Sequence, residues 1–201
     1  MSTKQMIISV GREFGSGGHE IAELLAEKFS LPLYDNNLLQ EIADEKNLNF
    51  EKLEKYDEKP KIKLFSRSVQ GFSNSPEENI ANIQFDFLRK KAEGGESFVI
   101  VGRCSEEILK NYDCITTVFI LGDLNAKIER ISRIYNVSPD KAESIIVQKD
   151  KKRKSYHNHY CKNKWGDSRN YELSINSSRI GVEKTAELIE NYINTKYGNL
   201  Q

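Results

Sequence analysis

The sequence GREFGSGGHE at 11–20 decides the fold, because it joins a short apolar run to a helical pattern. The run MIISV at 6–10 predicts a buried strand, and apolar residues recur at helical spacing over 21–29. The four glycines between them allow positive φ and let a ligand approach the backbone without a Cβ in the way. Successive N–H groups and a helix start then point at one spot, which indicates an anion site, most naturally for phosphate. A tight structural turn is the alternative interpretation.

This turn departs from the usual phosphate-binding pattern G-x-x-x-x-G-K-[ST]. If Gly17 is the glycine before the lysine, Gly18 stands where the lysine should be. His19 then stands where the magnesium-binding hydroxyl should be. The turn therefore lacks the side chain whose charge would face the β- and γ-phosphates.

Apolar runs and helical patterns alternate along the rest of the chain. Short, continuous apolar strands are typical of a parallel sheet that helices cover on both faces. The sequence predicts an α/β layered fold with about five strands, at 6–10, 31–34, 97–101, 115–121 and, at an edge, 171–175. An insertion at about 47–92 and a basic lid at about 136–167 interrupt the alternation.

Composition excludes several classes of protein. The chain has 201 residues, of which 38% are apolar and 30% charged, so we expect one folded domain over 1–201. No segment approaches about 18 consecutive apolar residues, which argues against a membrane-spanning helix. The first residues lack the apolar stretch of a signal peptide, and the three cysteines form no dense framework. We therefore expect a cytoplasmic protein with free thiols.

The formal net charge of +0 conceals an asymmetry. Residues 124–165 hold 11 Lys and Arg against 4 Asp and Glu, a net charge of +7, so the remainder carries −7. The balanced total argues against a uniformly basic nucleic-acid binder. A basic run is usually only a solvated face. Arginine, however, binds phosphate bidentately, which makes Arg130, Arg133 and Arg153 the candidate ligands in this segment.

Several motifs together resemble the cytidylate kinase-like family. They lie at 10–28 (VGREFGSGGHEIAELLAEK), 31–35 (LPLYD), 101–104 (VGRC), 151–160 (KKRKSYHNHY), 165–167 (WGD) and 171–179 (YELSINSSR). The resemblance covers most of the chain. It implies a three-layer P-loop kinase-like fold with a helical insertion of the kind that binds nucleoside monophosphates, and a basic lid.

The resemblance also implies an activity, namely ATP-dependent phosphoryl transfer to cytidylate or a similar nucleoside monophosphate, with Mg²⁺ expected for the reaction class. Such transfer requires positioning and cations rather than covalent chemistry. The resemblance assigns the ATP phosphates to the turn, at Gly11, Phe14, Gly15, Ser16, Gly17, Gly18, His19 and Glu20. We expect Arg12, Arg130, Arg133 and Arg153 to be the catalytic cations, and Asp150-x-x-Arg153 resembles the family's lid arginine arrangement.

Each of three residues has more than one interpretation. Arg12, the cation nearest the glycines in sequence, replaces part of the missing lysine or pairs with Glu13 or Glu20. Asp35, in the acceptor region, binds a sugar hydroxyl, holds a metal through water or caps the following helix. Arg103, also expected near the acceptor, meets a phosphate or anchors a salt bridge.

The motif H-x-H-x-C at 157–161 suggests metal binding. Its spacing is not that of a common zinc site, and no second Cys or His pair lies nearby in sequence. The sequence therefore predicts no metal ligands there, and predicts packing of the histidines around Tyr156, Tyr160 and Trp165 instead.

Two other functions stay open. A non-catalytic nucleotide- or phosphate-binding protein of the same fold would explain the missing lysine. A nucleic-acid or polyphosphate binder would use the basic segment and show steep salt dependence. We expect small nucleotides as partners, with no membrane and no nucleic acid. The apolar segment 65–72 fits either packing in a homodimer or a flap.

Overall fold

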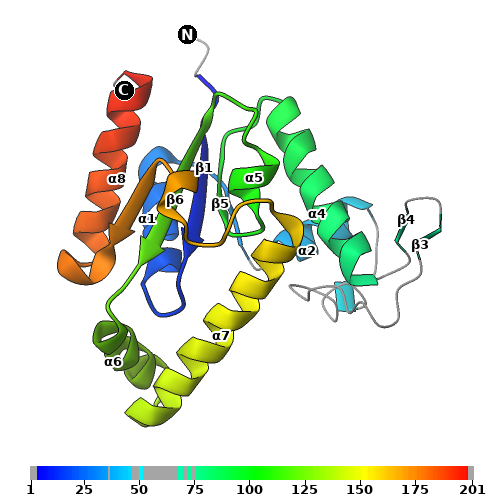
Figure 1. Ribbon diagram of the computed structural model, residues 1–201. Helices are drawn as coiled ribbons and strands as arrows, with labels where there is room; N and C mark the ends of the chain where they lie inside the picture. Colours follow the sequence, from blue (N-terminus) through cyan, green and yellow to red (C-terminus); the bar gives the residue numbers. More distant parts are fainter. Residues whose placement is uncertain are drawn as a thin grey trace.

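The computed structural model describes residues 4–35, 37–46, 50–51, 68–69, 72–73 and 76–198. Strand β1 lies at the centre of its main sheet. Five strands form one sheet in the order β2-β5-β1-β6-β7, and every neighbouring pair is parallel (Figure 1). Their bounds are β1 Ile7–Arg12, β2 Leu33–Tyr34, β5 Phe98–Val101, β6 Ile115–Leu121 and β7 Leu173–Asn176. The predicted parallel sheet of five strands is confirmed, including the edge position of the last strand.

Hydrophobic burial explains why the middle strands form as they do. The runs IISV in β1 and FVIV in β5 are buried along their whole length, since helices lie on both faces. Ile7 lies opposite Phe98 on one side and Ile115 on the other. After β1 the chain forms β2 and β5 on one side of that strand, and it then forms β6 and β7 on the other side. The carboxyl end of β1 is therefore a topological switch point, where open α/β sheets bind ligands.

Helices make two further layers (Figure 1). Helices α1 (Gly18–Phe29) and α8 (Val182–Tyr197) cover one face, where Leu25 and Ile189 are fully buried. Helices α2 (Leu38–Lys46), α4 (Pro76–Glu93) and α5 (Ser105–Ile108) cover the other, with Leu88 in the same core as Phe98. Because α4 packs on the sheet, the helical part of the expected insertion belongs to the main core.

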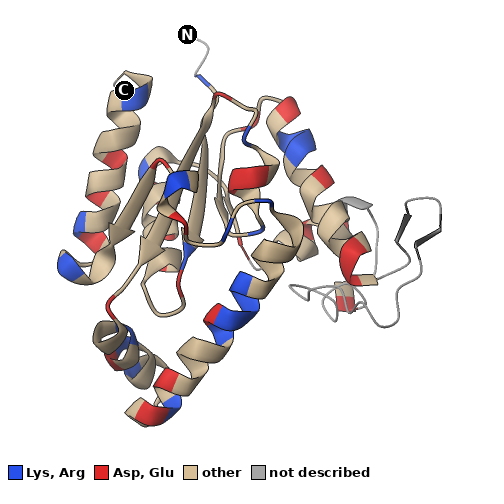
Figure 2. Ribbon diagram, in the orientation of Figure 1, with Lys and Arg blue, Asp and Glu red and all other residues tan. Residues whose placement is uncertain are grey.

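The basic segment 124–165 forms two helices, of which the second is long. Helix α6 (Leu124–Tyr135) leaves the carboxyl edge of the sheet, and α7 (Pro139–Tyr160) returns to it after Ser138 caps its first turn. The two helices pack through Ile131, Ala142 and Ile146. Most Lys and Arg positions of α7 lie in the half of the helix nearer the sheet (Figure 2). We call α6 and α7 together the lid helices.

The remaining described elements are short. Two 3-10 turns, Ser168–Asn170 and Ser177–Arg179, flank β7, and β3 (Ser68–Val69) pairs with β4 (Phe72–Ser73) in an antiparallel hairpin. Most of the segment 65–72 lies outside the described residues, so its expected role in a dimer or a flap stays a prediction. Within the described parts, no helix is both long and apolar enough to cross a membrane.

Candidate functional site

The glycine-rich turn lies between the end of β1 at Arg12 and the start of α1 at Gly18. Gly15 and Gly17 have φ values of +84° and +76°, which L side chains rarely adopt. A Cβ on Gly17 would also lie 2.7 Å from Val182 Cγ2. Gly17 occupies the N-cap position without a side chain to bond the first N–H groups of α1. Those N–H groups and the positive end of the helix dipole are thus left for a ligand.

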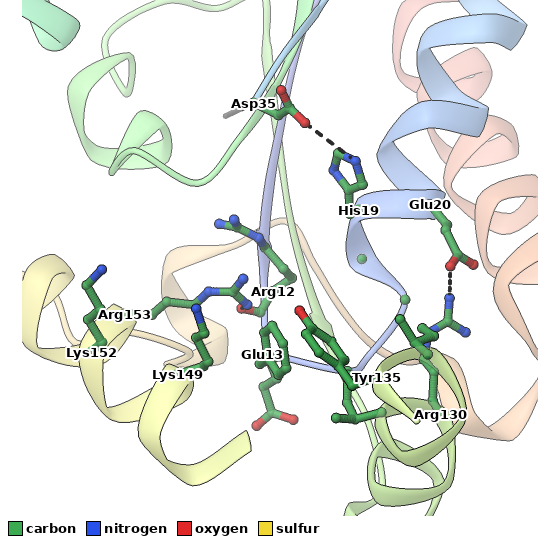
Figure 3. Close-up of a pocket in the computed structure, with 16 residues that line it drawn as sticks. Arg12, Glu13, His19, Glu20, Asp35, Arg130, Tyr135, Lys149, Lys152 and Arg153 are labelled. Carbon is green, nitrogen blue, oxygen red and sulfur yellow. Dashed lines mark hydrogen bonds and ion pairs between the residues drawn. The ribbon is translucent and has the colours of Figure 1, made fainter. Parts of the chain in front are cut away.

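A cleft of about 400 Å³ opens beside this turn (Figure 3). The turn and the end of β2 form one side, and the lid helices form the other. Five Lys or Arg residues line it against three acids, Glu13, Glu20 and Asp35. The five cations are Arg12, Arg130, Lys149, Lys152 and Arg153. The size and the excess positive charge suit a phosphorylated small molecule.

A buried lysine, Lys127 of α6, connects the turn to both lid helices. Its Nζ lies 2.9 Å from Glu13 Oε2 and 3.2 Å from Asp150 Oδ2 of α7. Asp150 Oδ1 accepts the Phe14 N–H at 2.6 Å, and Glu13 Oε2 accepts the Gly122 N–H at 3.1 Å. Lys127 is 6% exposed. We call Lys127, Glu13 and Asp150 the lid clamp.

Arg12 and Arg153 both line the cleft and are drawn near each other in Figure 3. The Arg12 stem packs so closely on Gly18 that a Cβ there would be 2.5 Å from Arg12 Cβ. Arg153 reaches from α7 and donates from Nη1 to the Arg12 carbonyl at 3.4 Å. Its guanidinium lies 5.3 Å from the centroid of the Phe14 ring, in cation–π geometry. A strand end and a lid helix thus bring two arginine side chains into the same cleft.

Arg130 stands over the other end of the turn. It pairs with Glu20 in the first turn of α1, and a Cβ on Gly17 would lie 3.5 Å from its guanidinium carbon. Glu13 is held by Lys127, so cations of α6 bind both of the carboxylates considered as partners of Arg12.

His19 and Asp35 lie together at the upper end of the cleft (Figure 3). His19 Nε2 is 3.4 Å from Asp35 Oδ2 and also 3.4 Å from Glu23 Oε1. Asp35 Oδ1 accepts the Asn37 N–H at 3.0 Å, just before α2 begins at Leu38. One oxygen of Asp35 therefore supports the start of α2, as the capping interpretation predicts, while the other faces His19 and the cleft.

Four predicted site residues do not line this cleft. Gly11 packs under Phe119, where a Cβ would approach Cδ2 to 2.8 Å. The Ser16 hydroxyl donates to the Glu13 carbonyl at 2.9 Å and so stabilises the turn from within.

The other two are arginines. Arg103 is 4% exposed and lies 3.5 Å from Gln84 Oε1 of α4. It lines a smaller cavity behind the cleft. Arg133 lies on the exposed face of α6.

The sequence did not single out Lys127, Lys149, Lys152 or Tyr135. Lys149 and Lys152 precede Arg153 by four and one residues, and the spacing of Lys149 and Arg153 places both on one face of α7. That helical spacing could have indicated that Lys149 shares the site of Arg153. No sequence pattern could have indicated Lys127, because its partner Glu13 is 114 residues away in the sequence.

A second ionisable cluster lies behind the cleft, where His157 Nε2 is 2.5 Å from Glu106 Oε1. Burial lowers the pKa of His157, but hydrogen bonding to Cys161 and Glu106 outweighs burial and raises the pKa to about 10. Hydrogen bonding to Cys104 and to His157 lowers the pKa of the Cys161 thiol to about 7. The same contact with Cys161, together with burial, raises the pKa of Cys104. Hydrogen bonds among these buried groups thus shift the pKa values of His157, Cys161 and Cys104.

The H-x-H-x-C motif at 157–161 divides in the structure. His159 is exposed and stacks edge-on against Tyr160, with ring centroids 4.7 Å apart, as the packing prediction expected. His157 and Cys161 instead point inward to Glu106 and Cys104.

Comparisons with known proteins agree with this architecture. The model of the cytidylate kinase-like family matches residues 7–179. A cytidylate kinase from Methanococcus vannielii is 26% identical over 194 residues, which cover 94% of this chain and 99% of that protein. An uncharacterized protein of known structure from Eubacterium ventriosum is 40% identical, with a TM-score of 0.76 and coverage of 95% and 99%. Shikimate kinase from Bacteroides thetaiotaomicron shares the fold at 15% identity, with a TM-score of 0.55 and coverage of 94% and 98%.

The lid clamp makes a prediction about stability. Lys127→Met keeps the apolar stem but leaves Glu13 and Asp150 without their shared cation, and should lower the free energy of unfolding by about 3 kcal/mol. Urea denaturation measures the change. Lys154→Met, at an exposed position on α7, is the matched control and should stay within about 0.5 kcal/mol of wild type. Equal effects of the two substitutions would contradict the clamp.

Proposed function

The chain belongs to the cytidylate kinase-like family, and we propose that it transfers the γ-phosphoryl group of ATP to a nucleoside monophosphate, cytidylate or a similar small acceptor. Family membership and the kinase fold support phosphoryl transfer of this general type. One observation carries the proposal for this chain: five Lys or Arg residues line a cleft that contains an uncapped, glycine-rich helix start.

These cations supply the positive charge that the missing lysine would bring to the phosphates. The N–H groups of residues 15–18 bind the donor phosphates, and the dipole of α1 favours their negative charge. Arg12 and Arg130 flank the turn from opposite sides and neutralise the β- and γ-phosphates. Arginine binds phosphate through two parallel N–H groups, so two arginines can replace one lysine at this site.

Arg153 stabilises the charge that develops on the transferring group. It enters the cleft from α7, beside Arg12, where it contacts the chain at Phe14 and at the Arg12 carbonyl. Electrostatic groups fixed in advance of the reaction are the main source of catalysis in phosphoryl transfer. The lid clamp provides this rigidity, because Asp150 precedes Arg153 by less than one helical turn.

The acceptor lies on the Asp35 side of the cleft, where that carboxylate meets a sugar hydroxyl. Arg103 is too deeply buried to line the cleft and supports this region from behind, through Gln84. Most side chains of 47–75 lie outside the described residues.

Magnesium fits this cleft through phosphate oxygens, water and one carboxylate, as it does in many phosphotransfer sites. Glu13 and Glu20 are each held by a lid cation, whereas Asp35 Oδ2 faces His19 at 3.4 Å, at the edge of the cleft. Asp35 would therefore hold the ion, through water. When bound, Mg²⁺ would offset the negative charge of the phosphate groups.

A coupled assay with ATP, Mg²⁺ and a panel of nucleoside monophosphates tests the proposal. Arg153→Ala should lower kcat by about 1,000-fold, because it removes a cation from the transferring group. Lys154→Ala, the neighbouring exposed residue, should keep wild-type turnover. Measurable ATP binding without turnover on any acceptor would instead support the non-catalytic nucleotide-binding alternative.

The replacement of the lysine makes a separate prediction for Arg12. Arg12→Ala should weaken ATP binding by about 10- to 100-fold, the usual loss for one charged hydrogen-bonding group. Isothermal titration calorimetry measures this directly, and Arg12→Lys should restore part of the affinity. An unchanged dissociation constant for Arg12→Ala would assign Arg12 a purely structural role.

Tyr135 offers a surface for a nucleotide base at the mouth of the cleft. The residue is 51% exposed, and its ring lies 6.2 Å from the Phe14 ring, centroid to centroid. Stacking of a base on an aromatic ring contributes about 1–3 kcal/mol. Tyr135→Ala should therefore raise KM for one nucleotide about tenfold with kcat nearly unchanged, whereas Tyr135→Phe should behave as wild type. Steady-state kinetics with each substrate varied in turn identify which nucleotide it is.

A further inference from the structure

Two segments far apart in the sequence bring four metal-binding side chains together behind the cleft. After β5, three consecutive residues, Gly102, Arg103 and Cys104, have φ values of +77°, +60° and +56°. This sharp turn starts α5 and directs Cys104 and Glu106 toward the end of α7. On α7, His157 and the C-cap residue Cys161 are four residues apart and so share one face.

The side-chain atoms converge closely. His157 Nε2 lies 2.5 Å from Glu106 Oε1, and one ligand atom from each of Glu106, His157 and Cys161 lies within 4.8 Å of the other two. The Cys104 and Cys161 thiols are within hydrogen-bonding reach of each other. All four residues are at most 8% exposed. A small cavity of about 30 Å³ adjoins Cys104, Glu106 and His157.

We propose that Glu106, His157 and Cys161, with Cys104 as the fourth ligand, form a buried zinc site that fastens the end of the lid helix α7 to the turn after β5. Thiolate sulfur, imidazole nitrogen and carboxylate oxygen are the groups that zinc prefers, usually four in a tetrahedron. Thiolates disfavour Mg²⁺ and Ca²⁺, which take oxygen ligands. The cavity has room for about one water molecule, so a single ion fits it and a larger cofactor does not.

Charge and proton balance are consistent with zinc. Binding moves the proton shared by His157 and Glu106, and the thiol protons of Cys104 and Cys161, to the solvent. Three anionic ligands around a dication then leave one negative charge. The buried guanidinium of Arg103, next to Cys104 in the chain, offsets that charge.

A neighbouring side chain orients the histidine. His157 Nδ1 lies 3.4 Å from Asn158 Oδ1, which also accepts the Trp165 N–H at 2.9 Å. Metal-bound histidines usually donate their second ring N–H to such an oxygen, and this fixes the tautomer. Asn158 therefore holds the Nδ1 proton and leaves Nε2, which faces Glu106, for the metal.

The site has no position left for a substrate, which marks it as structural. Arg153 lies one helical turn before His157 on α7, so a metal at this point fixes the base of the segment that carries the lid arginine. The spacing H-x-H-x-C could not reveal the site, because Glu106 is 51 residues from His157.

Metal titration tests this proposal without any activity assay. Chelator-treated full-length protein should take up one Zn²⁺ per chain in competition with a chromophoric chelator. Co²⁺ in its place should give the near-ultraviolet absorption of a thiolate–cobalt bond. Cys161→Ser and His157→Gln should each weaken Zn²⁺ binding by about 100-fold. Cys114→Ser and His159→Gln, which alter a distant cysteine and an exposed histidine, should bind as wild type.

The outcomes separate cleanly. The zinc site is refuted if wild type binds Zn²⁺ no more tightly than Cys161→Ser, or if His159→Gln loses as much affinity as His157→Gln. Absence of the thiolate absorption in the wild-type cobalt protein refutes it as well, and this readout holds even if a variant fails to fold. None of these measurements depends on kinase turnover, so the proposed function stands or falls independently.

Discussion

The cleft depends on the ion pairs that the ammonium group of Lys127 makes with two carboxylates. This ammonium group lies between Glu13 of the glycine-rich turn and Asp150 of α7, and Asp150 also accepts the Phe14 N–H. A buried cation shared by two carboxylates is stable only while all three groups stay together. The turn and both lid helices are therefore held in one arrangement, and Arg130 and Arg153 reach the cleft because of it.

This arrangement explains how the proposed phosphate site would work without the usual lysine. A P-loop lysine comes from the turn itself, whereas here the charge comes from the end of β1 and from the lid helices. Glu20 pairs with Arg130 and positions it beside the turn. The formal charge of +0 thus conceals a basic segment, whose side chains share the cleft with the acidic residues Glu13, Glu20 and Asp35.

The sequence predicted the fold well because continuous apolar runs and a glycine-rich turn are local signals. It also predicted most of the cleft, since Arg12, Arg130, Arg153 and Asp35 follow strands or lie in the basic segment. The contacts that position these residues could not be predicted. Glu13, which pairs with Lys127, is 114 residues away from it, and Glu106, which pairs with His157, is 51 residues away. The burial of Arg103 likewise depends on α4, which supplies Gln84.

A crystal structure with ADP and Mg²⁺ bound tests the central claim most directly. The account predicts the β-phosphate within hydrogen-bonding distance of the N–H groups of residues 15–18, with the guanidinium groups of Arg12 and Arg130 directed at its oxygens. Arg130 should then have exchanged at least one contact with Glu20 for the phosphate. A nucleotide whose phosphates lie away from the turn, with both arginines still bonded only to protein, would contradict it.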